Sequence, residues 1–579
     1  MTKTLKKLAS IIVTVVMVMA LGVATFAAEN PVVTIQKNDT NDKSAHSYEF
    51  YQVFSASVET DKSLYDIEWG TGVNSTASDF YTKLNAVAGF ESCTSADDVV
   101  AVLSGDGVTN DSTIVDAFAK FISGYTSSSK ATATLGASDT SANATLTSGY
   151  GYYFVKDTIT TSPVVDGAVS KFMLKVVNET TGITISTKAA VPTLDKDIVE
   201  TSGDVKQNQA SVGDTITFKL TSSVPDLRNK GYNKYCFVMN DTLSKGLTYV
   251  GTSTTNAQPT ITIGSKTLTS SEYDFSSTTD SVTGATKLEI VFKDFLTYGT
   301  DTDYIGEDIT VTYTAELNEN ADSTQAGNPN TATLIYSNDP SNTYNSDKPG
   351  SDDVTGKSPD VQTVTYTTGA KVIKTDASNN VLTGAKFKIT GTSSDQVIVT
   401  KTVYEEDADG SYYKLTDGTY TETAPTSATA DKYASTTVTY SSKEVTTLEE
   451  QAAGATDITV EVDADGSFLL TGLGKGTYTI TETVPPAGYV IDGIEHSLVI
   501  DCTIDSTTKK PTWTYTIDGV SATPVGDYVV LKVIDKKTSD LPETGSIGKA
   551  VFYIAGAMLV VTAAGLIVLK KRIGEDTAR

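Results

Sequence analysis

Three charged side chains stand within apolar strand patterns in the C-terminal third of the chain. Alternate residues of an extended strand share a face, so Lys374 lies on the same face as Val372 in AKVIKTD. By the same alternation, Glu482 follows an apolar stripe in YTITETV, and Asp535 follows one in YVVLKVID. Burial of such groups costs free energy unless they pair or become neutral. The sequence therefore predicts that these three residues meet in one core.

This combination of an amine and two carboxyl groups can form a covalent cross-link. Burial lowers the pKa of an amine and raises that of a carboxyl group. A neutral Lys374 amine can then attack the Asp535 carboxyl carbon, while protonated Glu482 polarises the carbonyl and shuttles protons. The expected product is an amide between Lys374 and Asp535, on the first and last strands of one domain. A buried ion cluster without a new bond is the alternative interpretation.

Two further sets of residues follow the same alternation. In the middle of the chain, Lys196, Asp241 and Asn330 each share a face with apolar neighbours on their own segment. Asn328 and Asn338 are alternatives for the amide-bearing residue. In the expected first domain, Lys37, Asp157 and Asn178 form a third set. The surrounding sequence gives this set weaker motif support.

The elements that position these residues are expected to be mainly β-strands. Thr, Ser, Gly, Val and Tyr dominate the middle of the chain, and short alternating runs are separated by turn residues. We expect tandem immunoglobulin-like β-sandwiches, with a helical patch in the first domain near ASDFYTKLNAVAGF and STIVDAFAKFI. The expected domains are 29–188, 189–367 and 368–540. The last domain carries a long insertion of hairpins between about residues 390 and 456.

Both ends of the chain have the composition of targeting segments. Residues 1–28 combine three lysines, an apolar run and closing alanines, which predicts a cleaved secretory signal peptide. The C-terminal end has Leu541, Pro542, Glu543, Thr544 and Gly545, then an apolar stretch at 550–569 and a basic tail at 570–579. The apolar stretch is long enough for a transmembrane helix, and the basic tail would remain in the cytoplasm.

Composition excludes several other functions. The formal net charge of −27 argues against nucleic acid as a partner. The chain has only two histidines and three scattered cysteines, with no spacing typical of metal ligands. We therefore expect no metal site, no cofactor and no enzyme with turnover. The acidic residues described above would act once, on their own chain.

The motifs resemble those of Gram-positive surface proteins. LPETG with its apolar stretch and basic tail is similar to a cell-wall sorting signal, which implies that a sortase cuts between Thr544 and Gly545. KVIKTDASNNVLTGAKFKI and YTITETVPPAGY resemble a Cna-B-type (SpaA-like) pilin domain, with Glu482 at the position of its catalytic acid. That family usually places Asn where this chain has Asp535.

The middle of the chain is similar to the middle domain of major pilins. NDTLSKGLTYV and GNPNTATLIYSNDP carry this resemblance, which implies that Lys196 is the nucleophile, Asn330 the acceptor and Asp241 the acid. We expect both amides to join the first and last strands of their domains.

Lys188, at the junction of the first two domains, resembles the pilin-motif lysine that attacks the sortase-bound threonine of the next subunit, although an ordinary surface lysine fits as well. The resemblance implies a backbone pilin, anchored at the cell wall from a membrane-bound precursor. Its partners would be a sortase, copies of itself, peptidoglycan or other pilins, and a host surface ligand. An adhesin or minor pilin, attached singly to peptidoglycan, is the alternative.

Overall fold

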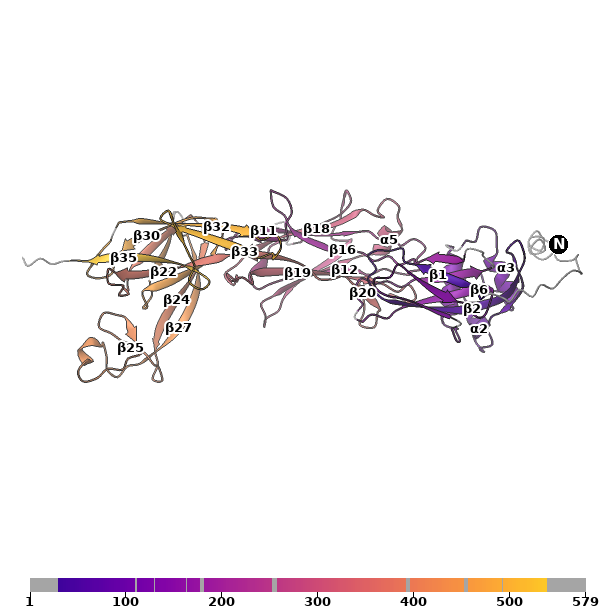
Figure 1. Ribbon diagram of the computed structural model, residues 1–579, viewed down its shortest axis with the longest axis horizontal. Helices are drawn as coiled ribbons and strands as arrows, with labels where there is room; N and C mark the ends of the chain where they lie inside the picture. Colours follow the sequence, from indigo (N-terminus) through magenta and orange to yellow (C-terminus); the bar gives the residue numbers. More distant parts are fainter. Residues whose placement is uncertain are drawn as a thin grey trace, which may run out of the picture.

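The computed structural model describes residues 30–538, apart from 110–111, 130, 163, 178–181, 252–257, 392–395, 452–456 and 492. The predicted signal peptide, sorting motif, transmembrane helix and basic tail lie outside the described residues. Within the described part of the chain, no helix is long and apolar enough to cross a membrane. The chain forms three β-rich bodies arranged one after another along the long axis of the molecule (Figure 1). The prediction of a mainly β protein built from successive β-sandwiches is confirmed.

The first body combines two sheets with three short helices. One sheet has the order β5-β1-β8, and the other has the order β3-β2-β6-β7 with β4 paired to β2. The elements are β1 (Val32–Gln36), β2 (His46–Val58), β3 (Leu64–Trp69), α2 (Phe80–Leu84), α3 (Ala96–Leu103), α4 (Thr113–Ser123), β4 (Ala131–Leu135), β5 (Ser141–Thr145), β6 (Gly151–Ile159), β7 (Lys171–Val176) and β8 (Ile183–Ser186). The expected helical patch corresponds to α2 and α4, whereas α3 was not expected. A Ser95 capping box, in which Ser95 and Asp98 bond each other's backbone N–H groups, begins α3.

The second body is a sandwich of two larger sheets. One has the order β10-β21-β19-β12-β17-β16 with β20 on β19, and the other has the order β15-β14-β18-β11-β9 with β13 on β18. The elements are β9 (Asp195–Ile198), β10 (Gln207–Gln209), β11 (Thr215–Ser223), β12 (Phe237–Leu243), β13 (Leu247–Tyr249), β14 (Thr260–Ile263), β15 (Lys266–Thr267), β16 (Tyr273–Thr279), β17 (Thr286–Phe292), α5 (Phe295–Thr300), β18 (Asp308–Leu317), β19 (Asn328–Ser337), β20 (Thr355–Lys357) and β21 (Val361–Tyr366).

The third body is a sandwich from which one long hairpin projects. Its sheets have the orders β27-β24-β29-β22-β35-β31 and β28-β23-β30-β32-β33-β34. The elements are β22 (Thr368–Asp376), β23 (Lys386–Thr390), β24 (Gln396–Glu406), β25 (Tyr413–Lys414), β26 (Tyr420–Thr421), η1 (Ala430–Lys432), β27 (Tyr440–Glu450), β28 (Ile458–Glu461), β29 (Ser467–Leu473), β30 (Gly476–Val484), β31 (Tyr489–Val490), β32 (Glu495–Ile504), β33 (Pro511–Ile517), β34 (Val520–Ala522) and β35 (Val529–Lys537). The β24–β27 hairpin and the β25–β26 pair extend away from the sandwich (Figure 1).

Strict alternation explains why the sandwiches form. In β18, every second residue from Ile309 to Leu317 is buried, and the residues between them face outward or are half-buried. Such a strand covers a core with one face and meets solvent with the other. The same alternation in β9 and β35 directs Lys196 and Asp535 into the core along with their apolar neighbours.

Hydrogen bonds of ordinary length connect adjacent bodies at both junctions. Ala168, from the loop after β6, is part of the apolar core of the second body, and the preceding Gly167 N–H donates to the Tyr336 hydroxyl at 3.0 Å. At the other junction, Val212 N–H donates to the Gly472 carbonyl at 2.8 Å. Each junction therefore contains direct contacts between adjacent bodies.

Candidate amide-forming sites

The C-terminal sandwich brings Lys374, Glu482 and Asp535 together. Lys374 Nζ lies 2.5 Å from Asp535 Oδ1 and 3.1 Å from Glu482 Oε2, and all three side chains are buried. Strands β22 and β35 are parallel neighbours in which Lys374 is opposite Val533, so Asp535 lies two residues further along and on the same face. Glu482 comes from β30 in the facing sheet. The amine therefore sits between an acceptor in its own sheet and an acid in the other.

The electrostatics of this trio favour proton transfer within it. Burial raises the pKa of Glu482; the Lys374 ammonium opposes this rise and Asp535 adds to it, giving a pKa of about 7. Asp535 interacts with Glu482 as well as with Lys374. The acceptor carboxyl group thus lies beside both the nucleophile and the acid.

The middle sandwich brings a second trio together across its two sheets. Lys196 on β9 has its Nζ 2.5 Å from Asp241 Oδ2 on β12, in the opposite sheet. Asn330 on β19 neighbours Asp241 through the β12–β19 pairing, in which Leu243 is opposite Asn330. Lys196, Asp241 and Asn330 are all buried. Burial lowers the pKa of Lys196, which favours the neutral amine that a nucleophile requires.

A tyrosine connects the members of this second trio. The Tyr313 hydroxyl, on β18, donates to Asp241 Oδ2 at 2.5 Å and accepts from Asn330 Nδ2 at 2.7 Å and from Lys196 Nζ at 3.1 Å. The Tyr313 ring stacks on the Phe218 ring, and Lys196 Nζ lies 5.1 Å from the centroid of the Phe218 ring. The sequence gives little indication of this role, because a tyrosine on the apolar stripe of DITVTYTAEL resembles an ordinary core residue.

The two alternative acceptors are engaged elsewhere. Asn328 holds the turn before β19, accepting from Asp322 N–H at 2.8 Å and donating to the Thr365 carbonyl at 3.2 Å. Asn338 donates to the Gly167 carbonyl at 3.3 Å, at the junction with the first body. Only Asn330, among these three, shares a hydrogen-bond network with Lys196.

One geometric expectation for the middle domain is wrong. We expected both cross-links to join first and last strands, as β22 and β35 do in the C-terminal sandwich. In the middle sandwich β9 is the first strand, but β20 and β21 follow β19 in the chain. Residues after Asn330 therefore remain outside the loop that a Lys196–Asn330 bond would close.

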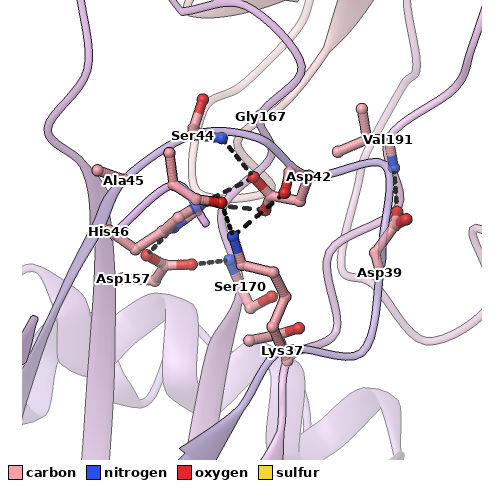
Figure 2. Close-up of polar contacts among 12 residues, drawn as sticks. Lys37, Asp39, Asp42, Ser44, Ala45, His46, Asp157, Gly167, Ser170 and Val191 are labelled. Carbon is pink, nitrogen blue, oxygen red and sulfur yellow. Dashed lines mark hydrogen bonds and ion pairs between the residues drawn. The ribbon is translucent and has the colours of Figure 1, made fainter. Parts of the chain in front are cut away.

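In the first body, the two described members of the predicted trio, Lys37 and Asp157, have other partners. Lys37 Nζ donates to the carbonyl oxygens of Asp42 and Ala137, both at 3.1 Å. Asp157 instead meets His46, whose Nδ1 lies 2.7 Å from Asp157 Oδ1, and it accepts from Ser170 N–H at 2.8 Å (Figure 2). Asn178 lies outside the described residues. The alternation of residues along the strand predicted the correct face for Asp157 but not its partner. Alternation does not specify which strands are neighbours.

His46 is held between two carboxylates. Its Nε2 lies 3.0 Å from Asp42 Oδ2, and both side chains are buried beside Asp157 (Figure 2). Burial lowers the pKa of His46, but hydrogen bonds to Asp157 and Asp42 outweigh that effect and raise the pKa to about 9. The first body therefore holds a buried imidazolium at neutral pH, stabilised by noncovalent contacts.

Lys188 lies at the junction of the first two bodies. Its backbone N–H donates to the Ser170 hydroxyl at 2.9 Å, and its side chain is half-buried. It lines a narrow crevice with Lys230, Tyr232 and Pro340 from the second body. Since Ser170 N–H in turn bonds Asp157, the backbone at Lys188 is tied to the His46 cluster.

Two family models match the C-terminal part of the chain. A SpaA-type domain of prealbumin-like fold matches residues 432–514, and an LPXTG cell wall anchor motif matches residues 534–576. The chain is thus an LPXTG-anchored surface protein that carries a SpaA-type domain. The predicted resemblance to such proteins, and the predicted location at the cell wall, are confirmed.

Individual relatives cover more of the chain. The trypsin-resistant surface T6 protein of Streptococcus pyogenes serotype M6 is 25% identical over 415 residues, which are 68% of this chain and 71% of the relative. Among solved structures, the T6 backbone pilin of the same serotype aligns over 88% of this chain and 99% of its own, at 16% identity and a TM-score of 0.48. The major pilin SpaD of Corynebacterium diphtheriae aligns over 88% of this chain and 98% of its own, at 14% identity and a TM-score of 0.42.

Proposed function

We propose that this chain is the backbone subunit of a covalent surface pilus, stabilised by side-chain amides in its second and third domains. The observation that carries the proposal is the buried contact between Lys374 Nζ and Asp535 Oδ1 at 2.5 Å, with Glu482 beside it. An LPXTG anchor motif at residues 534–576 and a T6 surface protein as relative support the assignment to a wall-anchored pilin.

Amide formation in the third domain needs only the residues of its trio. Glu482, with a pKa of about 7, is partly protonated at neutral pH and can donate to an Asp535 oxygen. The Lys374 amine then adds to the Asp535 carboxyl carbon, and one Asp535 oxygen leaves as water. The reaction removes a buried ammonium and a buried carboxylate, so the product avoids the cost of two charges in the core.

The intact mass of the secreted segment, residues 29–544, produced without a sortase, tests the internal amides. A Lys374–Asp535 amide removes about 18 Da as water, and a Lys196–Asn330 amide removes about 17 Da as ammonia. We expect both losses, and digestion should yield two branched peptides. An unmodified mass would contradict the internal amides and leave a wall-anchored β-protein held by noncovalent contacts.

Polymerisation is tested separately. We propose that Thr544 of one subunit, released from Gly545 by a sortase, is joined to Lys188 of the next. Reaction of the full precursor with its sortase should give a ladder of covalent oligomers, which Lys188→Ala abolishes.

Lys230→Ala is the matched control, because Lys230 lines the same crevice. A ladder that survives Lys188→Ala would move the linkage to another lysine, and no ladder with the unchanged chain would favour a singly attached adhesin or minor pilin.

A further inference from the structure

The acid of the middle trio does not reach the amide that it is expected to activate. Asp241 Oδ2 contacts Lys196 Nζ and the Tyr313 hydroxyl, and its other oxygen, Oδ1, has no hydrogen-bond partner among the described residues. Asn330 Oδ1 is likewise buried without a described donor. No described hydrogen bond therefore joins Asp241 to Asn330. The connection between them runs through Tyr313, whose hydroxyl contacts both.

We propose that Tyr313 is a catalytic residue that carries the proton from Asp241 to the departing nitrogen of Asn330. This inference rests on the proposed Lys196–Asn330 amide. Ammonia can leave only if Asn330 Nδ2 gains a proton, and Tyr313 is its hydrogen-bond partner in the described structure, at 2.7 Å. The same hydroxyl bonds Asp241 Oδ2 at 2.5 Å, so a proton needs to cross only two short hydrogen bonds.

The steps balance without any outside reagent. Lys196 Nζ first gives one proton to Asp241 Oδ2, which leaves a neutral amine and a neutral acid. The amine then bonds to Asn330 Cγ, and the carbonyl π electrons move to Oδ1. Asp241 passes its proton to the Tyr313 oxygen while Tyr313 gives its own proton to Asn330 Nδ2, and Nζ returns a second proton to Asp241. The Cγ–Nδ2 bond breaks, the carbonyl forms again, and the products are a secondary amide, ammonia and protonated Asp241.

The surroundings of Tyr313 fit this role. Its side chain is fully buried, stacks on Phe218 and contacts the Tyr249 ring, so the hydroxyl is held in one position. Burial, with Asp241 close by, raises the pKa of Tyr313 well above its usual range, so the phenol keeps a proton to donate. The C-terminal trio needs no such relay, since its acid, Glu482, interacts directly with the acceptor Asp535.

Removal of the hydroxyl tests the relay, with the third domain as an internal reference. Residues 29–544 are synthesised in a cell-free reaction, samples are quenched with acid over time, and branched peptides are quantified by mass spectrometry. We expect Tyr313→Phe to slow the Lys196–Asn330 amide about 100-fold, the size of a typical general acid–base contribution, while the Lys374–Asp535 amide forms at the unchanged rate. Tyr298→Phe is the matched control, because its hydroxyl also bonds a lysine and an acid, Lys266 and Glu272, outside the trio.

A second measurement distinguishes proton transfer from packing. A 3,5-difluorotyrosine at position 313 keeps the ring and the hydroxyl and makes the phenol a stronger proton donor. We expect this variant, unlike Tyr313→Phe, to form the middle amide at least as fast as the unchanged chain; a rate as slow as that of Tyr313→Phe would overturn the relay, as would Tyr313→Phe at the normal rate. A wild-type chain with only the 18 Da loss would instead overturn the middle amide itself, and the relay with it.

Discussion

Lys374 and Asp535 lie on β22 and β35, the first and last strands of the C-terminal sandwich, and these strands are parallel neighbours. The nitrogen of one side chain is 2.5 Å from an oxygen of the other, and both side chains are fully buried. A bond at this point would join the two ends of the domain directly. Any tension that enters through β22 would then leave through β35 without separating the strands between them.

Replacement of the acid should leave the nucleophile and acceptor in place but prevent their reaction. Glu482→Gln keeps the shape of the side chain and removes its proton-donating carboxyl group, so we expect the 18 Da loss to disappear. Two buried charges then persist in the core, and the melting temperature of the domain should fall. Glu495→Gln is a matched control on the neighbouring strand β32, where the side chain is exposed. Intact mass and calorimetry would check both effects, and an 18 Da loss retained in Glu482→Gln would rule out its role.

The rate of the same reaction should depend on pH in a defined direction. With a pKa of about 7, Glu482 is protonated below pH 7 and loses its proton as the pH rises through that value. Because the protonated acid is the reactive form, the Lys374–Asp535 amide should form more slowly at pH 8.5 than at pH 6. Acid-quenched samples from cell-free synthesis, analysed by peptide mass, would measure the rate at each pH. A rate that rises steadily over this range would contradict the assignment.

Strand alternation was enough to predict which side chains enter the cores. Lys196, Asp241, Asn330, Lys374 and Asp535 are each buried on the face that alternation indicates, because the side-chain period of a strand is two. Alternation gives no information about which strands become neighbours. The apolar stripes of their own strands predicted that Glu482 meets Lys374, and the motif that Glu482 shares with a known domain supported this prediction.

The wrong partner for Asp157 and the missed role of Tyr313 have one cause: alternation along a strand does not give the partners of a side chain. Asp157 was assigned to Lys37, yet the pairing of β2 with β6 brings His46 to it, with Tyr48 opposite Asp157 in the register. Tyr313 was missed because a phenol on an apolar stripe is indistinguishable from core packing until its hydroxyl partners are known. A polar atom on the inward face of DITVTYTAEL, in a domain already expected to bury Lys196, was the available signal.

The buried histidine should make the first domain less stable at alkaline pH. The pKa of His46 is raised from 6.5 to about 9 in the folded chain. A raised pKa means that the contribution is fully present below about pH 6.5 and is lost as the pH rises through 9. The unfolding free energy of this domain should therefore decrease by up to about 3 kcal/mol between pH 6 and pH 10. Denaturant melts followed at Trp69, which packs against the first-domain core, would report it.

Substitution of His46 provides the matching test. His46→Gln leaves Asp42 and Asp157 facing each other without the cation, and we expect a loss of about 3 kcal/mol. His496→Gln is the control, since the Asp518 partner of His496 is largely exposed. The chain has two histidines, so the imidazole NMR signals of the pair can be assigned from these two variants and the pKa of His46 read directly. A His46 pKa near 6.5 would contradict the buried ion cluster.

The two domains for which we propose an amide should respond differently to force. A Lys374–Asp535 amide encloses almost all of the third domain, so we expect no unfolding step from its sandwich. A Lys196–Asn330 amide shields residues 197–329 but leaves residues 331–366, including β21, in the path of tension. At roughly 3.5 Å per residue, the middle domain should give a step on the order of 100 Å, which Lys196→Ala lengthens to on the order of 600 Å. In the first domain the described part of the predicted trio does not come together, so we expect one full-length step that serves as the internal reference. Single-molecule pulling of residues 29–544 between its two ends would measure these lengths, and a full-length step from the middle domain of the unchanged chain would show that its amide is absent.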